Sequence, residues 1–379
     1  MTQPSSPTEI CLPVLPYQPR NPVDYSPGIA LVGCGGITKY HLEAYRAAGY
    51  RVTALCDIVR EAADKRREEY FPEARVFTDY REMLEIDDVD VVDVTTHPEI
   101  RVPIIENCLN AGKHVLSQKP FVLDLDDGER LADLADAKGL LLAVNQNARW
   151  APHFSYMREA VRAGMIGEVA SVHCGVHWDH SWVRGTMFEK VYHLILYDFA
   201  IHWFDFLSTV TANQRALRVF ASTAVSPTQD IMPALLGQAA IEYPRGQATL
   251  VFDGHAQHMP WDDAYIAGSL GTLRSFGPSV NRQTVELTRD GGDFRPQLVG
   301  QWFPDGFHGT MGELLCAIEE KRQPSHSARA NIRSLELSFA AVASAMRHEP
   351  IVPGTVRRLP DPPAAADGGV HASTSEVRG

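Results

Sequence analysis

A glycine-rich turn between a strand and a helix narrows the possible folds of this chain. The turn directly follows an apolar run and contains Gly33, Gly35, Gly36, Ile37 and Thr38. In this context, glycines permit a tight turn and the close approach of a pyrophosphate, whose charge meets the N-terminus of the helix. Thr38 replaces the third glycine of the dinucleotide fingerprint but is small enough for helix–strand packing. The turn predicts a dinucleotide site, and a glycine turn without a ligand is the alternative.

The first half of the chain alternates short apolar runs with amphipathic stretches, which is the pattern of βαβ units. Strands are predicted at residues 28–32, 52–56, 75–77, 89–94, 114–117 and 140–144. Helices are predicted at residues 38–48, 60–70, 80–84, 103–111 and 126–137. Runs that are apolar throughout, such as 29–32, are typical of strands buried on both faces. We therefore predict an α/β domain of the Rossmann type over residues 28–147.

The second half contains many strand-like runs that are joined by short turns. After a helix at 152–163, strands are predicted at residues 169–176, 216–221, 234–243, 247–252, 264–267, 272–276 and 284–288. Further helices are predicted at residues 194–207, 309–320 and 331–347. The pattern predicts an α+β domain over residues 148–349 with a large, predominantly antiparallel open sheet.

The two ends of the chain differ from these domains in composition. Residues 1–27 are rich in proline, which favours an extended arm lying on its own domain or on a neighbouring subunit. Apolar members of this arm, such as Ile10 and Leu12, indicate that it contacts another surface. Residues 350–379 are rich in Pro, Ala, Gly and Ser, and we predict a flexible tail there.

The charge balance disfavours two classes of partner. The 379 residues include 35 Lys and Arg against 47 Asp and Glu, which gives a net charge of −12. Such a chain repels nucleic-acid phosphates and anionic membrane surfaces. No apolar run approaches the roughly 20 residues that span a bilayer. The six cysteines lack C-x-x-C spacing, which predicts buried thiols and a cytoplasmic location.

An acidic residue ends the second predicted strand. Asp57 lies about 20 residues beyond the last glycine, where a carboxylate binds the hydroxyls of the adenosine ribose. Because that carboxylate repels a 2′-phosphate, we expect NAD rather than NADP, although Arg60 nearby leaves dual use open. The alternative role for Asp57 is to cap the helix at 60–70.

A lysine follows the fifth predicted strand, at the edge where open α/β sheets bind ligands. The segments after the fourth and fifth strands read Thr95-Thr96-His97 and Gln118-Lys119-Pro120. With the glycine turn and Asp57, these segments resemble the Gfo/Idh/MocA oxidoreductases (glucose–fructose oxidoreductase, inositol dehydrogenase and relatives) over residues 28–347. The tripeptide of that family is Glu-Lys-Pro, so Gln118 departs from it and alters the charge balance around Lys119. The resemblance implies cofactor contacts from the glycine turn, Asp57, Thr95, Thr96, His97, Gln118, Lys119 and Asn147.

A second motif lies in the helix predicted at 194–207. Asp198 and His202 resemble the Asp-x-x-x-His pair of the family, and the spacing of four places both on one helical face. In the family, this pair lies beside the nicotinamide together with the lysine that Lys119 matches. Without the resemblance, a histidine on an apolar helix is more often a hydrogen-bonded core residue.

These three side chains have the chemistry that alcohol oxidation needs, in which a hydroxyl proton is removed while a hydride leaves the same carbon. His202 is the candidate general base, because imidazole accepts a proton at neutral pH. Asp198 orients the substrate or shares its proton, and Lys119 stabilises the developing alkoxide. We expect an NAD-dependent dehydrogenase that oxidises a secondary or anomeric hydroxyl.

Polar and aromatic side chains near the predicted cleft are the candidate substrate contacts. Besides the three catalytic candidates, they are Arg149, Trp150, Trp178, Asp179 and His180. Aromatic rings cover the C–H face of a sugar while polar groups bind its hydroxyls. A sugar, sugar derivative or inositol is the predicted substrate. The alternative is that the aromatic rings pack the sheet and the histidines are exposed.

Other functions are compatible with parts of this pattern. One is a redox-neutral enzyme that holds NAD tightly and acts through a transient ketosugar, and another is a nucleotide-sensing protein on the same fold. A zinc site among His173, His177, His180, His193 and His202 is disfavoured, because His177 and His180 would face opposite sides of a strand. We therefore predict no metal. The resemblance also implies a homodimer or homotetramer.

Overall fold

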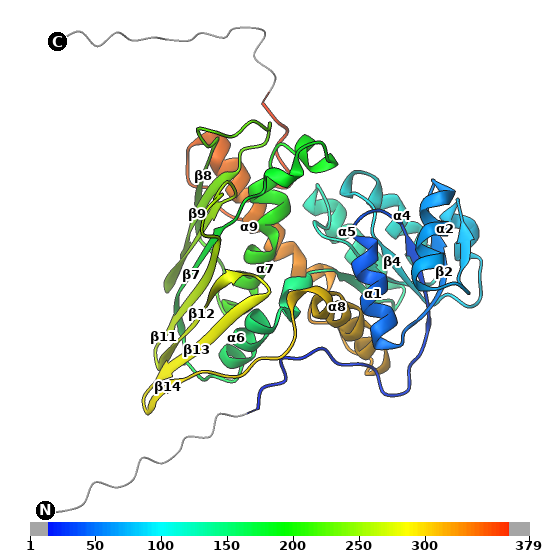
Figure 1. The fold of residues 1–379 in the computed structure, drawn as a ribbon, viewed down its shortest axis with the longest axis horizontal. Coiled ribbons are helices and arrows are strands. Elements are labelled where there is room, and N and C mark those ends of the chain that lie inside the picture. Colours follow the sequence, from blue (N-terminus) through cyan, green and yellow to red (C-terminus); the bar gives the residue numbers. More distant parts are fainter. Residues whose placement is uncertain (1–13, 364–379) are drawn as a thin grey trace, which may run out of the picture.

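A computed structural model describes residues 14–363, with a parallel sheet and a larger mixed sheet separated by helices (Figure 1). The parallel sheet has the order β3-β2-β1-β4-β5-β6. Its strands are β1 Gly28–Val32, β2 Arg51–Cys56, β3 Arg75–Phe77, β4 Val91–Val94, β5 His114–Ser117 and β6 Leu142–Val144. Its helices are α1 Thr38–Ala48, α2 Arg60–Tyr70, α3 Tyr80–Leu84, α4 Pro98–Asn110 and α5 Leu125–Ala137. The predicted Rossmann architecture is confirmed.

The strand order explains where a ligand site can form in this sheet. β1 pairs with β2 on one side and with β4 on the other, so the direction of winding reverses between β1 and β4. Loops that follow these two strands diverge and leave a crevice at the carboxyl edge. One helix differs from prediction: α4 begins at Pro98, because proline fits the first helical position, and the predicted start at residue 103 is wrong.

The second sheet has eight strands in the order β14-β13-β12-β11-β7-β10-β9-β8, and only β7 and β10 run parallel within it. The strands are β7 Val169–His177, β8 Arg218–Ala224, β9 Leu236–Tyr243, β10 Gly246–Asp253, β11 Trp261–Gly268, β12 Gly271–Ser279, β13 Arg282–Arg289 and β14 Gly292–Phe294. The helices are α6 Pro152–Arg162, α7 Ile201–Val210, α8 Trp302–Glu319 and α9 Ala328–Arg347. The predominantly antiparallel sheet is confirmed, and the short edge strand β14 was not predicted.

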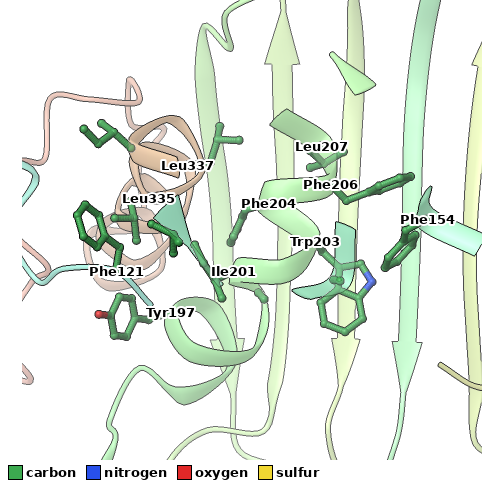
Figure 2. Packing of buried hydrophobic residues seen from close by; sticks show 14 of the residues in the cluster. Phe121, Phe154, Tyr197, Ile201, Trp203, Phe204, Phe206, Leu207, Leu335 and Leu337 are labelled. Atoms are coloured by element: carbon green, nitrogen blue, oxygen red, sulfur yellow. The ribbon is translucent and has the colours of Figure 1, made fainter. Parts of the chain in front are cut away.

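Helices α7 and α9 lie side by side on one face of the second sheet (Figure 2). Ile201 and Phe204 of α7 lie among the apolar side chains that join the helix to α9, and Phe206 stacks on Phe154 of α6 with ring centroids 4.4 Å apart. Burial of each such side chain contributes about 1.5–3 kcal/mol. This packing fixes α7 rigidly over the sheet, and the first turn of α7 carries His202.

Helix α8 covers the Rossmann domain although it follows the second sheet in the sequence. Phe307 and Met311 pack against Leu42 of α1 in one apolar cluster. The close packing of α8 requires glycine, because a Cβ on Gly309 would lie 2.1 Å from Trp150 Cγ. Helix α8 therefore packs with the Rossmann domain, although its residues fall within the range 148–349 predicted for the second domain.

Both ends of the described chain lie against the protein. Residues 14–27 run extended along the surface, where the Glu319 carboxylate accepts hydrogen bonds from the backbone N–H groups of Val23, Asp24 and Tyr25 at 2.9, 2.7 and 2.9 Å. At the other end, Ile351 is buried beside β8. The predicted flexible tail is therefore wrong for residues 350–363. Ile10, Leu12 and residues 364–379 lie outside the described residues.

Two further predictions concern composition. The cysteines at positions 34, 56, 108, 174 and 316 are all buried free thiols, as predicted, whereas Cys11 lies outside the described part of the chain. Within residues 14–363, no helix combines the length and apolar character that a bilayer crossing requires.

Candidate active site

The glycine turn lies at the carboxyl end of β1, next to the end of β4. Gly33 has a φ of 97°, and a Cβ there would lie 3.0 Å from Thr95 Oγ1. Gly35 and Gly36 line a cavity, and a Cβ on either would meet no atom within 4 Å. The open space beside the N-terminus of α1 fits the pyrophosphate of a dinucleotide.

Three more residues predicted to bind the cofactor flank this turn. Ile37 lines the cavity. Thr38 is fully buried, and its hydroxyl donates to the carbonyl of the first glycine at 2.8 Å, so it fastens the turn. Asp57 accepts hydrogen bonds from the backbone N–H groups of Cys34 at 2.7 Å and Val59 at 2.9 Å. The Asp57 carboxylate is thus fixed beside the turn, and it also meets the start of α2.

The loops after β4 and β5 form one wall of the cavity, which has a volume of about 720 Å³. The lining residues from these loops include Thr95, Thr96, His97, Gln118 and Lys119. Arg101 of α4 joins the two loops, since its guanidinium donates to Thr96 O at 3.1 Å and to Gln118 O at 2.6 Å. Burial lowers the pKa of Arg101 to about 10. Sequence reasoning assigned no role to Arg101.

A buried network holds Gln118 in place. Gln118 Oε1 accepts the backbone N–H of Lys119 at 2.7 Å, and Gln118 Nε2 lies 3.1 Å from His41 Nε2. His41 Nδ1 lies 2.7 Å from Asp93 Oδ2, which also accepts from Tyr45 OH at 2.6 Å. Asn145 Nδ2 also lies 3.1 Å from His41 Nε2, so two buried amides face this ring nitrogen.

Lys119, Asp198 and His202 line the same cavity. Lys119 Nζ donates to the backbone carbonyl of Asp198 at 3.0 Å and lies 3.3 Å from its Oδ2. The predicted single helix at 194–207 is divided, because Leu194–Phe199 form a π-helical turn and α7 begins at Ile201. Asp198 lies in that turn and His202 in the first turn of α7, so both side chains line the cavity.

The environment of His202 determines its protonation. Burial lowers the pKa of His202 well below its usual range, and the charge of Lys119 lowers it further. The His202 imidazole is therefore neutral at pH 7. Its Nδ1 is buried without a hydrogen-bond partner among the described residues. A neutral ring in a cavity can accept a proton from a bound hydroxyl.

The predicted substrate residues fall into two groups. Trp178 and His180 line the cavity, as does Asn147, which was predicted to bind the cofactor. Arg149 does not, because it is buried in an ion pair with Asp205 at 2.6 Å. The remaining two, Trp150 and Asp179, also lie outside the cavity lining. The substrate roles predicted for Arg149, Trp150 and Asp179 are therefore corrected to structural roles.

Contacts with other protein groups explain why Trp150 and Asp179 lie outside the cavity. Trp150 is buried and its ring packs edge-on to His326 with centroids 5.1 Å apart. Asp179 is exposed, and its carboxylate accepts the backbone N–H of Ser181 at 2.9 Å. The side chains thus complete the core and a turn rather than the cleft.

Sequence reasoning missed most of the aromatic lining of the cavity. Rings that were not predicted there are Tyr40, Phe188, Phe199, Trp203, Phe252, Trp302 and Phe303. Trp302 donates its indole N–H to Asn147 Oδ1 at 2.8 Å and so joins α8 to the end of β6. The predicted helix began at residue 309, whereas α8 begins at Trp302. The adjacent aromatic residues Trp302 and Phe303 were the sequence signal that could have indicated this part of the lining.

The histidines considered for a zinc site are dispersed. His173 is hydrogen-bonded to Thr249 at 2.7 Å, and His193 lies 2.9 Å from a backbone carbonyl of the C-terminal segment. His180 and His202 line the cavity. In residues 14–363, no three His, Cys, Asp or Glu side chains are grouped so that they could hold a metal ion.

The fold and these side chains define a two-domain dinucleotide-binding protein with a cleft between the domains. Two family models match the chain: the oxidoreductase family with an NAD-binding Rossmann fold over residues 28–146, and the GFO/IDH/MocA C-terminal domain over residues 154–274. The chain belongs to the Gfo/Idh/MocA oxidoreductase family.

Individual relatives support this assignment over different lengths. D-apiose dehydrogenase from Paraburkholderia graminis is 33% identical over 139 residues, which cover 36% of this chain and 37% of that protein. Myo-inositol 2-dehydrogenase from Thermotoga maritima is 25% identical over 329 residues, covering 83% of this chain and 95% of that protein. Three curated relatives, D-apiose dehydrogenase among them, match over only 33% to 43% of their own length.

A solved structure shows the same fold. The oxidoreductase from Agrobacterium radiobacter in complex with NAD+, L-tartaric acid and magnesium superposes with a TM-score of 0.78 at 19% identity. The superposition covers 87% of this chain and 99% of that one. At this identity the likeness concerns the fold alone.

Buried neutral histidines make stability depend on pH. Burial lowers the pKa of His180 to about 4 and that of His153 and His326 to about 3. Unfolding releases these rings to a pKa near 6.5, so the unfolded chain binds more protons below that pH. We expect the free energy of unfolding to fall between about pH 6.5 and 5, by up to about 1.4 kcal/mol per pH unit for each ring.

Urea unfolding at several pH values in that window measures this slope. His180→Phe keeps an aromatic ring stacked on Trp178 and removes one titrating group. The unfolding free energy of this variant should therefore depend less steeply on pH, by up to about 1.4 kcal/mol per pH unit. Equal slopes for the variant and the parent protein would show that His180 is not a buried neutral base.

Proposed function

We propose that the protein is an NAD-dependent dehydrogenase that oxidises a secondary or anomeric hydroxyl of a sugar, sugar derivative or inositol. The observation that carries this proposal is the contact of Lys119 Nζ with Asp198, at 3.0 and 3.3 Å, in the cavity that the glycine turn also lines. The named activities of D-apiose dehydrogenase and myo-inositol 2-dehydrogenase support the substrate class.

The residues around the turn fit a dinucleotide. Gly35 and Gly36 leave room for a pyrophosphate, and Thr95 and His97 line the adjacent wall. Asp57 is held beside the turn by the Cys34 N–H, which supports its role on the ribose hydroxyls of the adenosine. When bound, the nicotinamide supplies the hydride acceptor. The chain must then position the alcohol, remove its proton and exclude water.

The side chains divide these tasks. Neutral His202 accepts the hydroxyl proton, and the ammonium of Lys119 stabilises the negative charge that develops on the oxygen. Asp198 holds Lys119 in place through two contacts and orients the substrate hydroxyl. The aromatic rings that line the cavity exclude water, which strengthens both interactions.

The outer face of the second sheet supports a homodimer or homotetramer as part of the proposal. Within residues 14–363 this face carries no helix, and it exposes Phe220, Val251 and Tyr265. Burial of these side chains against a second copy would remove apolar surface from water.

Removal of the base tests the proposed chemistry. His202→Asn should lower kcat roughly 10²–10⁴-fold while the dissociation constant for NAD stays unchanged. The measurement is NADH absorbance with aldoses, aldonates, cyclitols and glycosides, alongside calorimetric titration of NAD. His193→Asn is the matched control, because His193 lies outside the cavity lining. Near-normal turnover of His202→Asn would contradict the assignment. Failure of every substrate to produce free NADH would contradict net oxidation.

Asp57 tests the preference for NAD. Asp57→Ala removes the carboxylate that would repel a 2′-phosphate, so the ratio of the dissociation constants for NADP and NAD should fall at least tenfold, about 1.4 kcal/mol. Calorimetric titration with each dinucleotide measures this ratio without turnover. Asp124→Ala is the control, because Asp124 caps α5 away from the turn. A ratio unchanged by Asp57→Ala would show that another group selects the cofactor.

The oligomer is tested at the exposed sheet face. Val251→Lys places a charge on that face and should convert the assembly to monomers in sedimentation velocity. Val299→Lys is the matched control, because Val299 is also exposed but lies in the loop before α8. A parent protein that sediments as a monomer would refute the proposed assembly.

A further inference from the structure

The part of the cavity contributed by the second domain is lined mainly by aromatic rings. We call Trp178, His180, Trp182, Phe188 and Phe199 the aromatic wall. The rings contact one another: Trp178 and His180 are stacked with centroids 5.3 Å apart, and His180 and Phe199 are 4.6 Å apart. Trp182 stacks on Phe199 at 6.1 Å. The wall is therefore one continuous surface built mainly from the segment between β7 and α7.

Polar side chains are scarce on the same side of the cavity. Among the described residues that line the cavity after Asn147, Asp198 is the only one with a carboxylate, amide, ammonium or guanidinium group, and Lys119 already contacts it. The hydroxyl of Thr186 donates to the carbonyl of Val183 at 2.6 Å and accepts the N–H of Phe188 at 3.2 Å. Thr186 is therefore engaged within its own loop.

This scarcity constrains the substrate. A free sugar or inositol carries hydroxyls around its whole ring, and each hydroxyl buried without a partner opposes binding. Lys119, Asp198 and His202 can bind hydroxyls at one end of the cavity. On the aromatic wall the hydrogen-bonding side-chain atoms are the ring nitrogens of Trp178, His180 and Trp182, and Trp178 Nε1 and His180 Nδ1 are buried without a partner among the described residues. These few atoms cannot satisfy the hydroxyls of a whole polyol ring, so a largely apolar group fits there better than a polyol does.

The wall is also uncharged and partly open. Burial lowers the pKa of His180 to about 4, so this ring is neutral at pH 7. Trp182 is 55% exposed, so part of its ring is open to solvent at the edge of the wall. Neutral, accessible ring faces favour a planar aromatic group, since aromatic pairs stack or meet edge-on.

We propose that the substrate is a sugar derivative with an aromatic substituent, whose sugar hydroxyl reaches Lys119 and His202 while its aryl group lies on the aromatic wall. The inference rests on the proposed function for the reacting end of the substrate. The contact between the aryl group and the wall is a separate property, and binding without turnover measures it.

The test compares phenyl and methyl glycosides of the same sugars. The probes are the β-D-glucosides, β-D-galactosides and β-D-xylosides, titrated calorimetrically into the full chain with NADH, so that no hydroxyl is oxidised. For at least one sugar, the phenyl glycoside should bind at least tenfold more tightly than the methyl glycoside. Equal affinities for every pair, or no binding by any probe, would overturn the inference.

Variants of the aromatic wall test whether the preference for phenyl over methyl glycosides arises there. Trp182→Ala should reduce the phenyl-to-methyl affinity ratio to below threefold, whereas Trp182→Phe should retain most of it. Trp261→Ala is the matched control, because Trp261 is a partly exposed tryptophan on β11 that does not line this cavity. An unchanged ratio in Trp182→Ala would show that the aryl group binds elsewhere and would overturn the inference.

The outcome for the aryl group is distinguishable from the outcome for the redox chemistry. Tight phenyl glycoside binding without NADH production from NAD would preserve the wall as a binding site and contradict the dehydrogenase. NADH production from methyl glycosides at the same kcat/KM as from phenyl glycosides would preserve the dehydrogenase and contradict the aryl site.

Discussion

The contact between Lys119 and Asp198 joins the two domains at the point where chemistry can occur. Lys119 follows β5 of the parallel sheet, and Asp198 lies in the π-helical turn before α7 of the second domain. Among the described residues that line the cavity, Lys119 comes from the first domain, whereas Asp198 and His202 come from the second. Because Lys119 binds a carbonyl as well as a carboxylate, its position depends on the backbone of the turn. The packing of α7 against α9 and the second sheet therefore determines the site geometry (Figure 2).

The Rossmann side fixes Lys119 by a different route. The chain from Asp93 through His41 to Gln118 is buried, and it ends on the backbone N–H of Lys119. Asn145 Nδ2 also lies 3.1 Å from His41 Nε2, so two buried amides face one ring nitrogen. A glutamate at position 118 would place a carboxylate in this buried network and would lose the amide donor of Gln118. The departure from the family tripeptide therefore changes both the hydrogen-bond donors and the charge beside Lys119.

The sequence predicted the features that depend on local order. The glycine turn, the parallel sheet and the four-residue spacing of Asp198 and His202 follow from short patterns and chain direction. Arg149 was misassigned because its partner, Asp205, is 56 positions away and no local pattern reveals that pair. The start of α8 at Trp302 was missed for a similar reason, since tertiary packing against the Rossmann domain sets it. Long-range side-chain pairs therefore limited the prediction more than secondary structure did.

The lowered pKa of His202 is consistent with a role as a base. In the resting site, burial and the charge of Lys119 both disfavour the imidazolium. A hydroxyl that loses its proton beside Lys119 becomes an anion, and this negative charge offsets the ammonium that His202 experiences. In the proposed reaction the basicity of His202 would thus rise as the proton moves, which favours transfer when a hydroxyl is placed next to Lys119. Water exclusion by the surrounding rings strengthens this coupling, because charges interact more strongly at low dielectric.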